Sequence, residues 1–154
     1  MKKTITIILI SSATFSCTTN TSAPAEQVNS ISGTWKLFSG STIVREDTVI
    51  TDYTKDQQMI KIINDSHFSF LRHDLNKGKD SLKAIYSSGG GRYSLTGDQY
   101  TEYLDYCSDR EWEGHTFNFT VAVKNDTLIQ NGVEKIENLG IERLIIEKYI
   151  RMKN

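Results

Sequence analysis

The chain has only two cysteines and one proline in 154 residues, and it has no apolar run of the ~18 residues that a membrane-spanning helix needs. Two cysteines are too few for a disulfide-stapled scaffold or a four-cysteine zinc site. The sequence also lacks an excess of one charge, because 18 Lys and Arg residues face 19 Asp and Glu residues and the formal net charge is −1. We therefore exclude a nucleic-acid-binding protein with a basic surface and expect one ordinary globular domain.

Residues 1–16 have the pattern of a secretory signal peptide. Lys2 and Lys3 give a positive start, a short apolar stretch follows at residues 5–10, and small residues come next. The alternative is a buried strand over residues 4–10, because that stretch is rich in β-branched residues. The paired lysines at the very start and the polar chain that follows favour the signal peptide.

Cys17 follows this segment directly. The Thr-Phe-Ser-Cys sequence at residues 14–17 resembles a bacterial lipoprotein box, which implies lipid attachment at Cys17. Cleavage elsewhere, leaving a free cysteine, is the alternative. Residues 17–29 are small and polar and are typical of a flexible tether. We expect an outer-membrane lipoprotein that faces the periplasm, with a folded domain over residues 30–154.

Helical periodicity is missing from this domain, and alternation of apolar with polar residues dominates instead. One stretch, residues 116–123, places four apolar side chains on one face: Phe117, Phe119, Val121 and Val123. A two-residue turn at residues 125–126 then predicts a hairpin that pairs Val123 with Leu128 and Val121 with Gln130. Short strands separated by turn signals predict a sandwich or a barrel, and a closed barrel removes exposed sheet edges.

Two further hairpins are predicted. A two-residue turn at residues 97–98, with glycine first, predicts the pairs Leu95–Tyr100, Tyr93–Glu102 and Gly91–Leu104, with Tyr106 on the same face. A three-residue loop at residues 64–66 predicts the pairs Ile62–Phe68 and Ile60–Phe70. Residues 33–39, 42–50 and 142–151 are expected to form three more strands.

Several short motifs lie on these strands. Gly33-Thr34-Trp35 resembles the Gly-x-Trp signature of lipocalins, and residues 147–151 resemble the last strand of that fold, with Arg151 near Trp35. Residues 89–102 resemble bacterial secreted lipocalin-like proteins, which carry a Gly-Gly-x-Tyr strand, a tight turn and a Tyr-Thr-Glu strand; residues 125–128 resemble their later hairpin. The resemblance covers about residues 31–152. It implies an all-β fold, an up-and-down antiparallel β-barrel of about eight to ten strands.

Glu102 is the main candidate for a binding residue, because it falls on an otherwise apolar face. A charge there must be paired, hydrated or protonated. Either Glu102 is a polar anchor for a ligand, or it is paired with an interior arginine or a tyrosine hydroxyl. The aromatic residues expected to line the same space as ligand-binding residues are Tyr93, Tyr100, Phe68, Phe70, Phe117 and Phe119. At the barrel bottom, Gly33, Trp35 and Arg151 are expected to provide closure, with a cation–π contact that contributes ~0.5–2 kcal/mol.

The remaining motifs are better explained by structure than by chemistry. His67 and His73 would lie ~20 Å apart on one strand, too far to share a metal, and His115 would join them only through the fold. The glycine run at residues 89–91 lacks the ending of a phosphate loop and indicates a bend. The acidic residues between 105 and 113 lack the spacing of a calcium loop. Trp112, in that loop, is either a lid over a barrel mouth or a membrane contact.

These patterns predict binding of a small lipophilic or amphipathic molecule inside a barrel, for storage, sensing or transport. No Ser-His-Asp or Cys-His arrangement is apparent, so we expect no enzyme, and no cofactor or metal is implied. The alternative is a periplasmic interaction or inhibitor module with a packed, ligand-free barrel and an envelope protein as partner. An empty cavity would favour the first interpretation and an exposed apolar patch around Trp112 the second.

Overall fold

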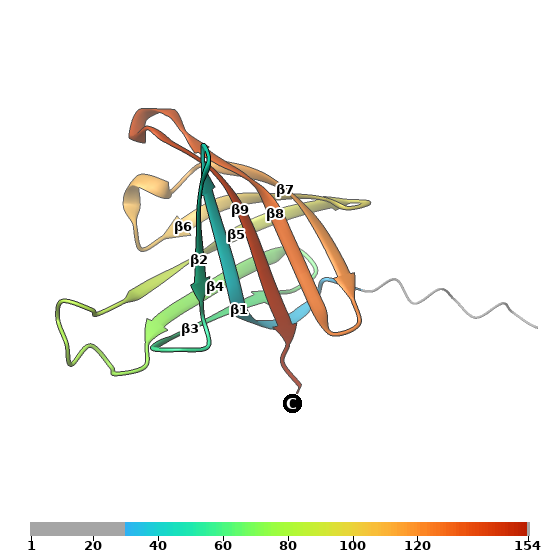
Figure 1. Ribbon diagram of the computed structural model, residues 1–154. Helices are drawn as coiled ribbons and strands as arrows, with labels where there is room; N and C mark the ends of the chain where they lie inside the picture. Colours follow the sequence, from blue (N-terminus) through green and yellow to red (C-terminus); the bar gives the residue numbers. More distant parts are fainter. Residues whose placement is uncertain (1–29, 154) are drawn as a thin grey trace, which may run out of the picture.

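The computed structural model describes residues 30–153, which form nine strands and two short 3-10 helices (Figure 1). The strands are β1 (Gly33–Val44), β2 (Asp47–Asp52), β3 (Gln57–Ile63), β4 (His67–Asp74), β5 (Tyr86–Thr96), β6 (Gln99–Cys107), β7 (Thr116–Lys124), β8 (Thr127–Ile136) and β9 (Ile141–Arg151). The 3-10 helices are η1 (Arg110–Trp112) and η2 (Glu137–Leu139). The expected signal peptide, Cys17 and the tether lie outside the described residues. Within residues 30–153, no helix is long and apolar enough to cross a membrane.

Eight of the strands close into an antiparallel barrel, which confirms the predicted all-β, up-and-down fold. Neighbouring strands follow chain order from β3 to β9, and β9 pairs back onto β1. The first residues of β1 pair with β3, and β2 is an extra strand beside the second half of β1. Closure satisfies backbone hydrogen-bonding groups that a flat sheet would expose along its edges.

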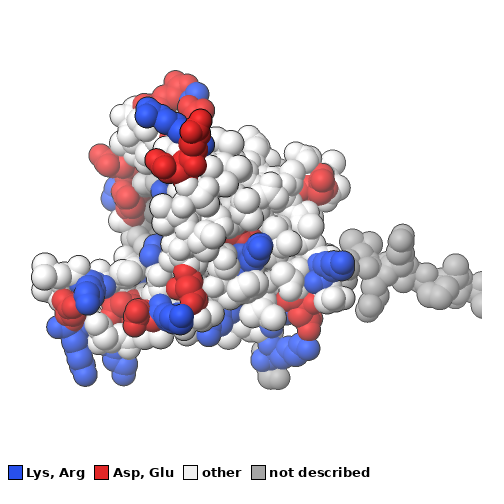
Figure 2. Space-filling model, viewed as in Figure 1, with Lys and Arg blue, Asp and Glu red and all other residues white. Residues whose placement is uncertain are grey.

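The barrel has two different ends. The tight turns at residues 64–66, 97–98 and 125–126 surround what we call the closed end, where β1 begins. The longer connections, including η1 and η2, surround the open end, to the left in Figure 1. Charged side chains of both signs gather over the β1–β2 and β8–β9 hairpins on the face shown in Figure 2.

The β7–β8 hairpin has the register that its sequence predicts, with Val123 opposite Leu128 and Val121 opposite Gln130. The β5–β6 hairpin also begins as predicted, with Leu95 opposite Tyr100. Both registers follow from two-residue turns, which fix how the flanking strands align.

A β-bulge changes the β5–β6 register further along. Gly90 pairs with Tyr106 and residue 92 with residue 103, so both Leu104 and Asp105 lie opposite Gly91. A Cβ at Gly91 would overlap a backbone carbonyl oxygen of β6, so only glycine fits this close approach. The bulge reverses the facing of the strand, and Tyr106 is 71% exposed. The predicted inward-facing Tyr106 is therefore wrong, whereas Leu104 is buried as predicted but shares its position opposite Gly91 with Asp105 in place of a regular pair.

The predicted β3–β4 register is wrong by one residue. The observed pairs are Ile63–Phe68, Ile62–Ser69, Lys61–Phe70 and Ile60–Leu71, in place of Ile62–Phe68 and Ile60–Phe70. The reason lies in the turn, where the Asn64 N–H donates to the His67 carbonyl and the Asn64 side chain accepts from the N–H groups of Ser66 and His67. This Asx-type turn shortens the loop. A one-residue shift exchanges the faces of a strand, so Lys61 points into the barrel.

The predicted single strand at residues 42–50 is also wrong, because a turn at residues 45–46 divides it. Arg45 has a positive φ of 54° there, and β1 folds back onto β2 with Ser41 opposite Ile50. Tyr53 follows β2, and its ring fills the space that a side chain at Gly40 would need, 2.9 Å from the ideal Cβ. This packing brings Tyr53 towards the barrel interior.

The closed end is sealed by an aromatic and aliphatic layer. Trp35 and Leu37 are completely buried there, and the Trp35 indole N–H donates to the Ile31 carbonyl at 2.7 Å. The Arg151 guanidinium lies 4.0 Å from the Trp35 ring centroid and donates to the Ser32 carbonyl at 2.7 Å. A Cβ at Gly33 would lie 2.6 Å from Arg151 Nη1, so glycine leaves room for the stack that the sequence predicts.

Candidate ligand cavity

A cavity of about 330 Å³ lies inside the barrel near its open end. Its wall is mixed, and its apolar part comes from several strands and the η1 segment: Met59, Phe70, Leu104, Trp112, Phe117, Phe119 and Ile145. Its polar residues are Tyr53, Lys61, Arg72, Ser87, Glu102, Cys107, Ser108, Asp109, Gln130, Glu134, Arg143, Glu147 and Tyr149. Small-molecule sites usually have an apolar wall with a few converging polar groups, so this cavity is more polar than most of them, and its volume is at the lower end of that class.

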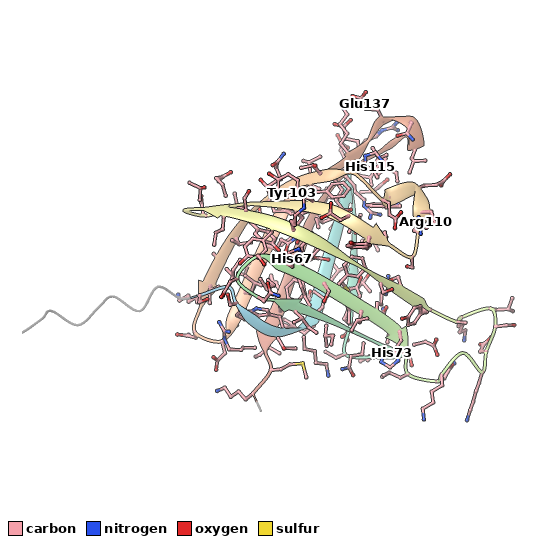
Figure 3. The ribbon with its side chains drawn as sticks, turned by 180° about the vertical axis from the view of Figure 1, so that it is seen from behind. His67, His73, Tyr103, Arg110, His115 and Glu137 are labelled. Carbon is pink, nitrogen blue, oxygen red and sulfur yellow. The ribbon has the colours of Figure 1, made fainter. Side chains whose placement is uncertain are left out.

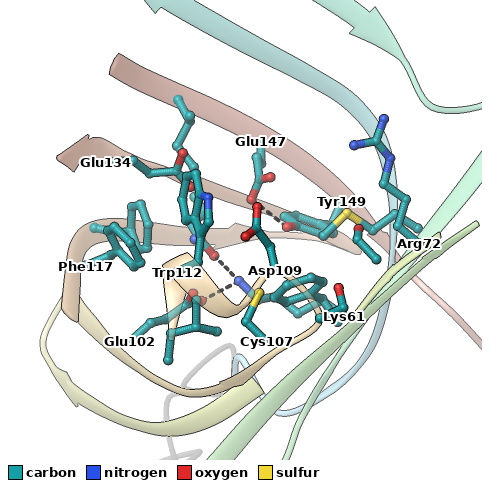
Figure 4. Close-up of a pocket in the computed structure, with 18 of the residues that line it drawn as sticks. Lys61, Arg72, Glu102, Cys107, Asp109, Trp112, Phe117, Glu134, Glu147 and Tyr149 are labelled. Atoms are coloured by element: carbon teal, nitrogen blue, oxygen red, sulfur yellow. Dashed lines mark hydrogen bonds and ion pairs between the residues drawn. The ribbon is translucent and has the colours of Figure 1, made fainter. Parts of the chain in front are cut away.

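The best-buried part of the polar lining is centred on Lys61 (Figure 4). The Lys61 ammonium forms an ion pair with Glu102 and donates to Gln130 Oε1 at 2.7 Å. All three residues are buried, with 3%, 7% and 1% of their surfaces exposed. Lys61, Glu102 and Gln130 come from β3, β6 and β8, so this cluster of three side chains connects three separate strands across the barrel. Removal of such charges from water is costly unless each is paired, and here each is.

Aromatic rings surround the same ammonium group. Its nitrogen lies 5.3 Å from the Phe68 ring centroid, 5.6 Å from that of Tyr100 and 5.8 Å from that of Tyr149. These distances are within the range of cation–π attraction. The three rings lie on the closed-end side of the cavity and separate it from the apolar layer below.

Glu147 is a second acid that lines the cavity, next to the cluster of Lys61, Glu102 and Gln130. The Tyr149 hydroxyl donates to Glu147 Oε2 at 2.6 Å, and none of the described Lys, Arg or His residues forms an ion pair with this carboxylate. Loss of hydration raises the pKa of Glu147, an effect that the nearby Lys61 charge opposes. The Glu147 carboxyl group thus faces the cavity with the Tyr149 hydroxyl as its donor and with no ion-pair partner among the described residues.

Tyr100 contributes a hydroxyl that no other described residue hydrogen-bonds, although the residue is only 1% exposed. Burial raises the pKa of Tyr100 well above its usual value, and the neighbouring Glu102 carboxylate adds to this effect. The Tyr100 side chain thus lies beside the Lys61–Glu102 pair, on the closed-end side of the cavity.

The mouth of the cavity is bordered by η1 and by the upper parts of β8 and β9. The Trp112 ring lies 5.8 Å from that of Phe117, and the Arg143 guanidinium lies 5.1 Å from the Trp112 ring centroid. Arg143 is itself paired with Glu134 at 2.6 Å. Asp109 caps η1 by accepting from the Glu111 N–H. Trp112 is partly buried and lines the cavity, as the lid interpretation requires.

The residues predicted to bind a ligand fall into two groups. Glu102, Phe70, Phe117 and Phe119 line the cavity. Phe68, Tyr93 and Tyr100 face the interior nearer the closed end and are not part of the lining. Of the two alternatives for Glu102, the structure shows the paired one, but the ion-pair partner is Lys61 rather than an arginine. Lys61 was missed because the predicted β3–β4 register placed it outside; the signal for it was an interior acid in need of a cation.

The three histidines considered as candidates lie apart from one another, and Asp105 of the acidic loop is held in an ion pair. His67 and His73 are exposed and His115 is partly buried, and the three are well separated in Figure 3. No group of three or more metal-ligating side chains occurs in the described part of the chain. Asp105 pairs with Arg92 at 3.0 Å. Burial raises the pKa of the Cys107 thiol, which lowers its reactivity.

Fold and cavity together define the class of this protein: a closed, eight-stranded antiparallel β-barrel with an internal, partly apolar cavity. Comparison of the sequence with models of known protein families and with curated proteins finds no match. The function must therefore be argued from the cavity itself.

Proposed function

We propose that the barrel binds a small amphipathic molecule in its interior and acts by storage, sensing or transport rather than by catalysis. The observation that carries this proposal is the cavity of about 330 Å³, which has aromatic and aliphatic side chains in its wall and a buried polar floor formed by Lys61, Glu102 and Gln130. Burial of apolar ligand surface against such a wall contributes ~25 cal/mol per Å² before the costs of association are subtracted. The polar floor would orient the molecule.

The alternative, an interaction module with a packed barrel, has less support. It requires an interior filled by side chains and an exposed apolar patch around Trp112. Instead, Trp112 packs on Phe117 beneath Arg143, at the edge of an unfilled cavity.

Calorimetric titration with 1-octanol, a neutral amphipathic probe, tests the proposal. We expect saturable one-to-one binding that is abolished in Leu104→Trp, because an indole at this buried position occupies the cavity. Leu71→Trp is the matched control, since Leu71 is 42% exposed on the outer face of β4 and its replacement should leave binding unchanged. Circular dichroism verifies that both variants fold, and Ile145→Phe replaces Leu104→Trp if the latter does not. Absence of saturable binding, or equal binding by a folded cavity-filling variant, would overturn the proposal.

The proposal extends to location: a lipid on Cys17 holds the protein at the periplasmic face of the outer membrane. The Arg151 side chain binds the Ser30 carbonyl at the closed end, so the chain enters the barrel at the end opposite the cavity mouth. Attachment through the N-terminal segment would thus leave the mouth accessible. The mass of the mature protein from cell envelopes tests this, because lipidation adds acyl mass and Cys17→Ala abolishes both the addition and the membrane fractionation. An unmodified, soluble protein would refute it.

A further inference from the structure

The charges that face the cavity do not balance. Its lining holds three cations, Lys61, Arg72 and Arg143, and four acids, which are Glu102, Asp109, Glu134 and Glu147. Two of the acids have partners within the lining, since Glu102 pairs with Lys61 and Glu134 with Arg143. The partners of the other three charged groups decide what the cavity attracts.

Arg72 and Asp109 each have a hydrogen-bond partner near the mouth of the cavity. The Arg72 guanidinium donates to Gln57 Oε1 at 2.8 Å and lies 5.2 Å from the Tyr53 ring centroid. Figure 4 shows it pointing away from Lys61 and Glu102. Asp109 accepts the N-terminal N–H of η1 and is exposed to solvent. Arg72 is half-buried and Asp109 is exposed, so water can screen both charges.

Glu147 differs from both. It is partly buried and lines the cavity on the same face of β9 as the fully buried Tyr149, and the Tyr149 hydroxyl is the hydrogen-bond donor that the structure gives it. Among the described residues no cation lies within ion-pair distance of this carboxylate.

The one deep cation cannot serve an anionic ligand as readily. Lys61 already donates to Glu102 and Gln130, and three aromatic rings surround its ammonium group. A carboxylate ligand would have to displace Glu102 and would approach Glu147 at the same time. Like charges in a site of low dielectric constant repel strongly.

We propose that the ligand is an amphipathic amine whose ammonium group pairs with Glu147, while its apolar part lies against Phe70, Phe117 and Phe119. This inference rests on the proposed function and names the chemical class of its ligand. The ammonium supplies the cation that Glu147 lacks, and the surrounding rings favour a cation over an anion. Trp112 then covers the apolar part at the mouth.

A series of probes with one chain length tests the inference: n-octylamine, 1-octanol and octanoate, titrated calorimetrically at pH 7.5. We expect octylamine to bind about tenfold more tightly than octanol, the size of one charge-assisted hydrogen bond, and octanoate to bind most weakly. Glu147→Gln should remove the preference for octylamine over octanol. Glu142→Gln makes the same chemical change on the same strand at an exposed position, and should retain the preference.

The outcomes separate the two proposals. If none of the three probes binds, the proposed function fails. If octanol or octanoate binds as tightly as octylamine, or if Glu147→Gln retains the preference, the barrel binds ligands but the amine assignment is wrong. A thermal melt of each variant verifies that it is folded under the titration conditions.

Discussion

Replacement of Lys61 by methionine should destabilise the barrel severely. Methionine keeps most of the buried stem but removes the charge, which leaves Glu102 buried at 7% exposure without its cation. The Gln130 side-chain oxygen also loses its donor, at 2.7 Å in the native protein. Because the pair is almost fully removed from water, solvent screens the interaction between the two charges only weakly.

The loss of one partner from a buried ion pair costs about 3–5 kcal/mol. Domains of this size are stable by only about 5–15 kcal/mol, so Lys61→Met should lose a large part of its free energy of unfolding. Replacement of both charges, in Lys61→Met with Glu102→Leu, should recover most of the loss, because an apolar pair does not carry an unpaired charge. Lys148→Met is the control, since Lys148 is an exposed residue of β9.

Urea unfolding, followed by the fluorescence of Trp35 and Trp112, measures these differences. We expect the single variant to lose at least about 3 kcal/mol and the double variant to lose less than the single one. A free energy of unfolding for Lys61→Met within about 1 kcal/mol of the native value would refute the reasoning. It would mean that the Glu102 charge is not confined to a site without water.

Three further predictions concern other positions. Gly91→Ala should destabilise the protein by about 2 kcal/mol or more in urea unfolding, because its Cβ would overlap a carbonyl oxygen, whereas exposed Ser94→Ala on the same strand should have little effect. Trp112→Ala should speed octanol dissociation about tenfold in stopped-flow measurements by removing the cover of the cavity, and an unchanged rate would exclude the lid role. Burial raises the pKa of Glu147, so the native protein holds this proton more tightly than the unfolded chain does, and its stability falls as the pH rises from the unfolded pKa through the native pKa. Glu147→Gln should therefore melt at a higher temperature than the native protein at pH 8, and the difference should vanish at acid pH where Glu147 is protonated; a lower melting temperature at pH 8 would contradict the sign.

The parts of the fold that the sequence predicts correctly are those fixed by short turns. The two-residue turns at residues 97–98 and 125–126 align their strands without help from the rest of the chain. Alternation then assigns one face to the core, as it does for Phe117 and Phe119. These signals are local, so a single sequence contains them.

The errors arise where one face cannot be distinguished from the other. β3 has apolar residues on both faces, so its alternation does not reveal that Lys61 points inward and Ile62 outward. Only the Asn64 side chain, through its bonds to the turn, sets the register. The bulge beside Gly91 likewise depends on two strands at once, and it exchanges the facing of Tyr106.

The residues of the candidate site also divide into those that the local sequence reveals and those that only the assembled barrel reveals. Glu102 was identifiable because it is an acid on an apolar face. Glu147 was not, since the assembly of β9 beside β1 and β8 is needed to show that it lacks a cation. Interior charge balance is a property of the closed barrel rather than of any one strand.

Native mass spectrometry of residues 18–154, produced in bacteria without the lipid and followed by solvent extraction, tests the central claim most directly. The account predicts a reproducible small-molecule adduct, or one that forms on addition of octylamine, which is lost on denaturation and is absent from the folded Leu104→Trp variant. A protein that shows only its own mass under both conditions, or that retains the adduct when the cavity is filled, would contradict the claim that the barrel is a binding site.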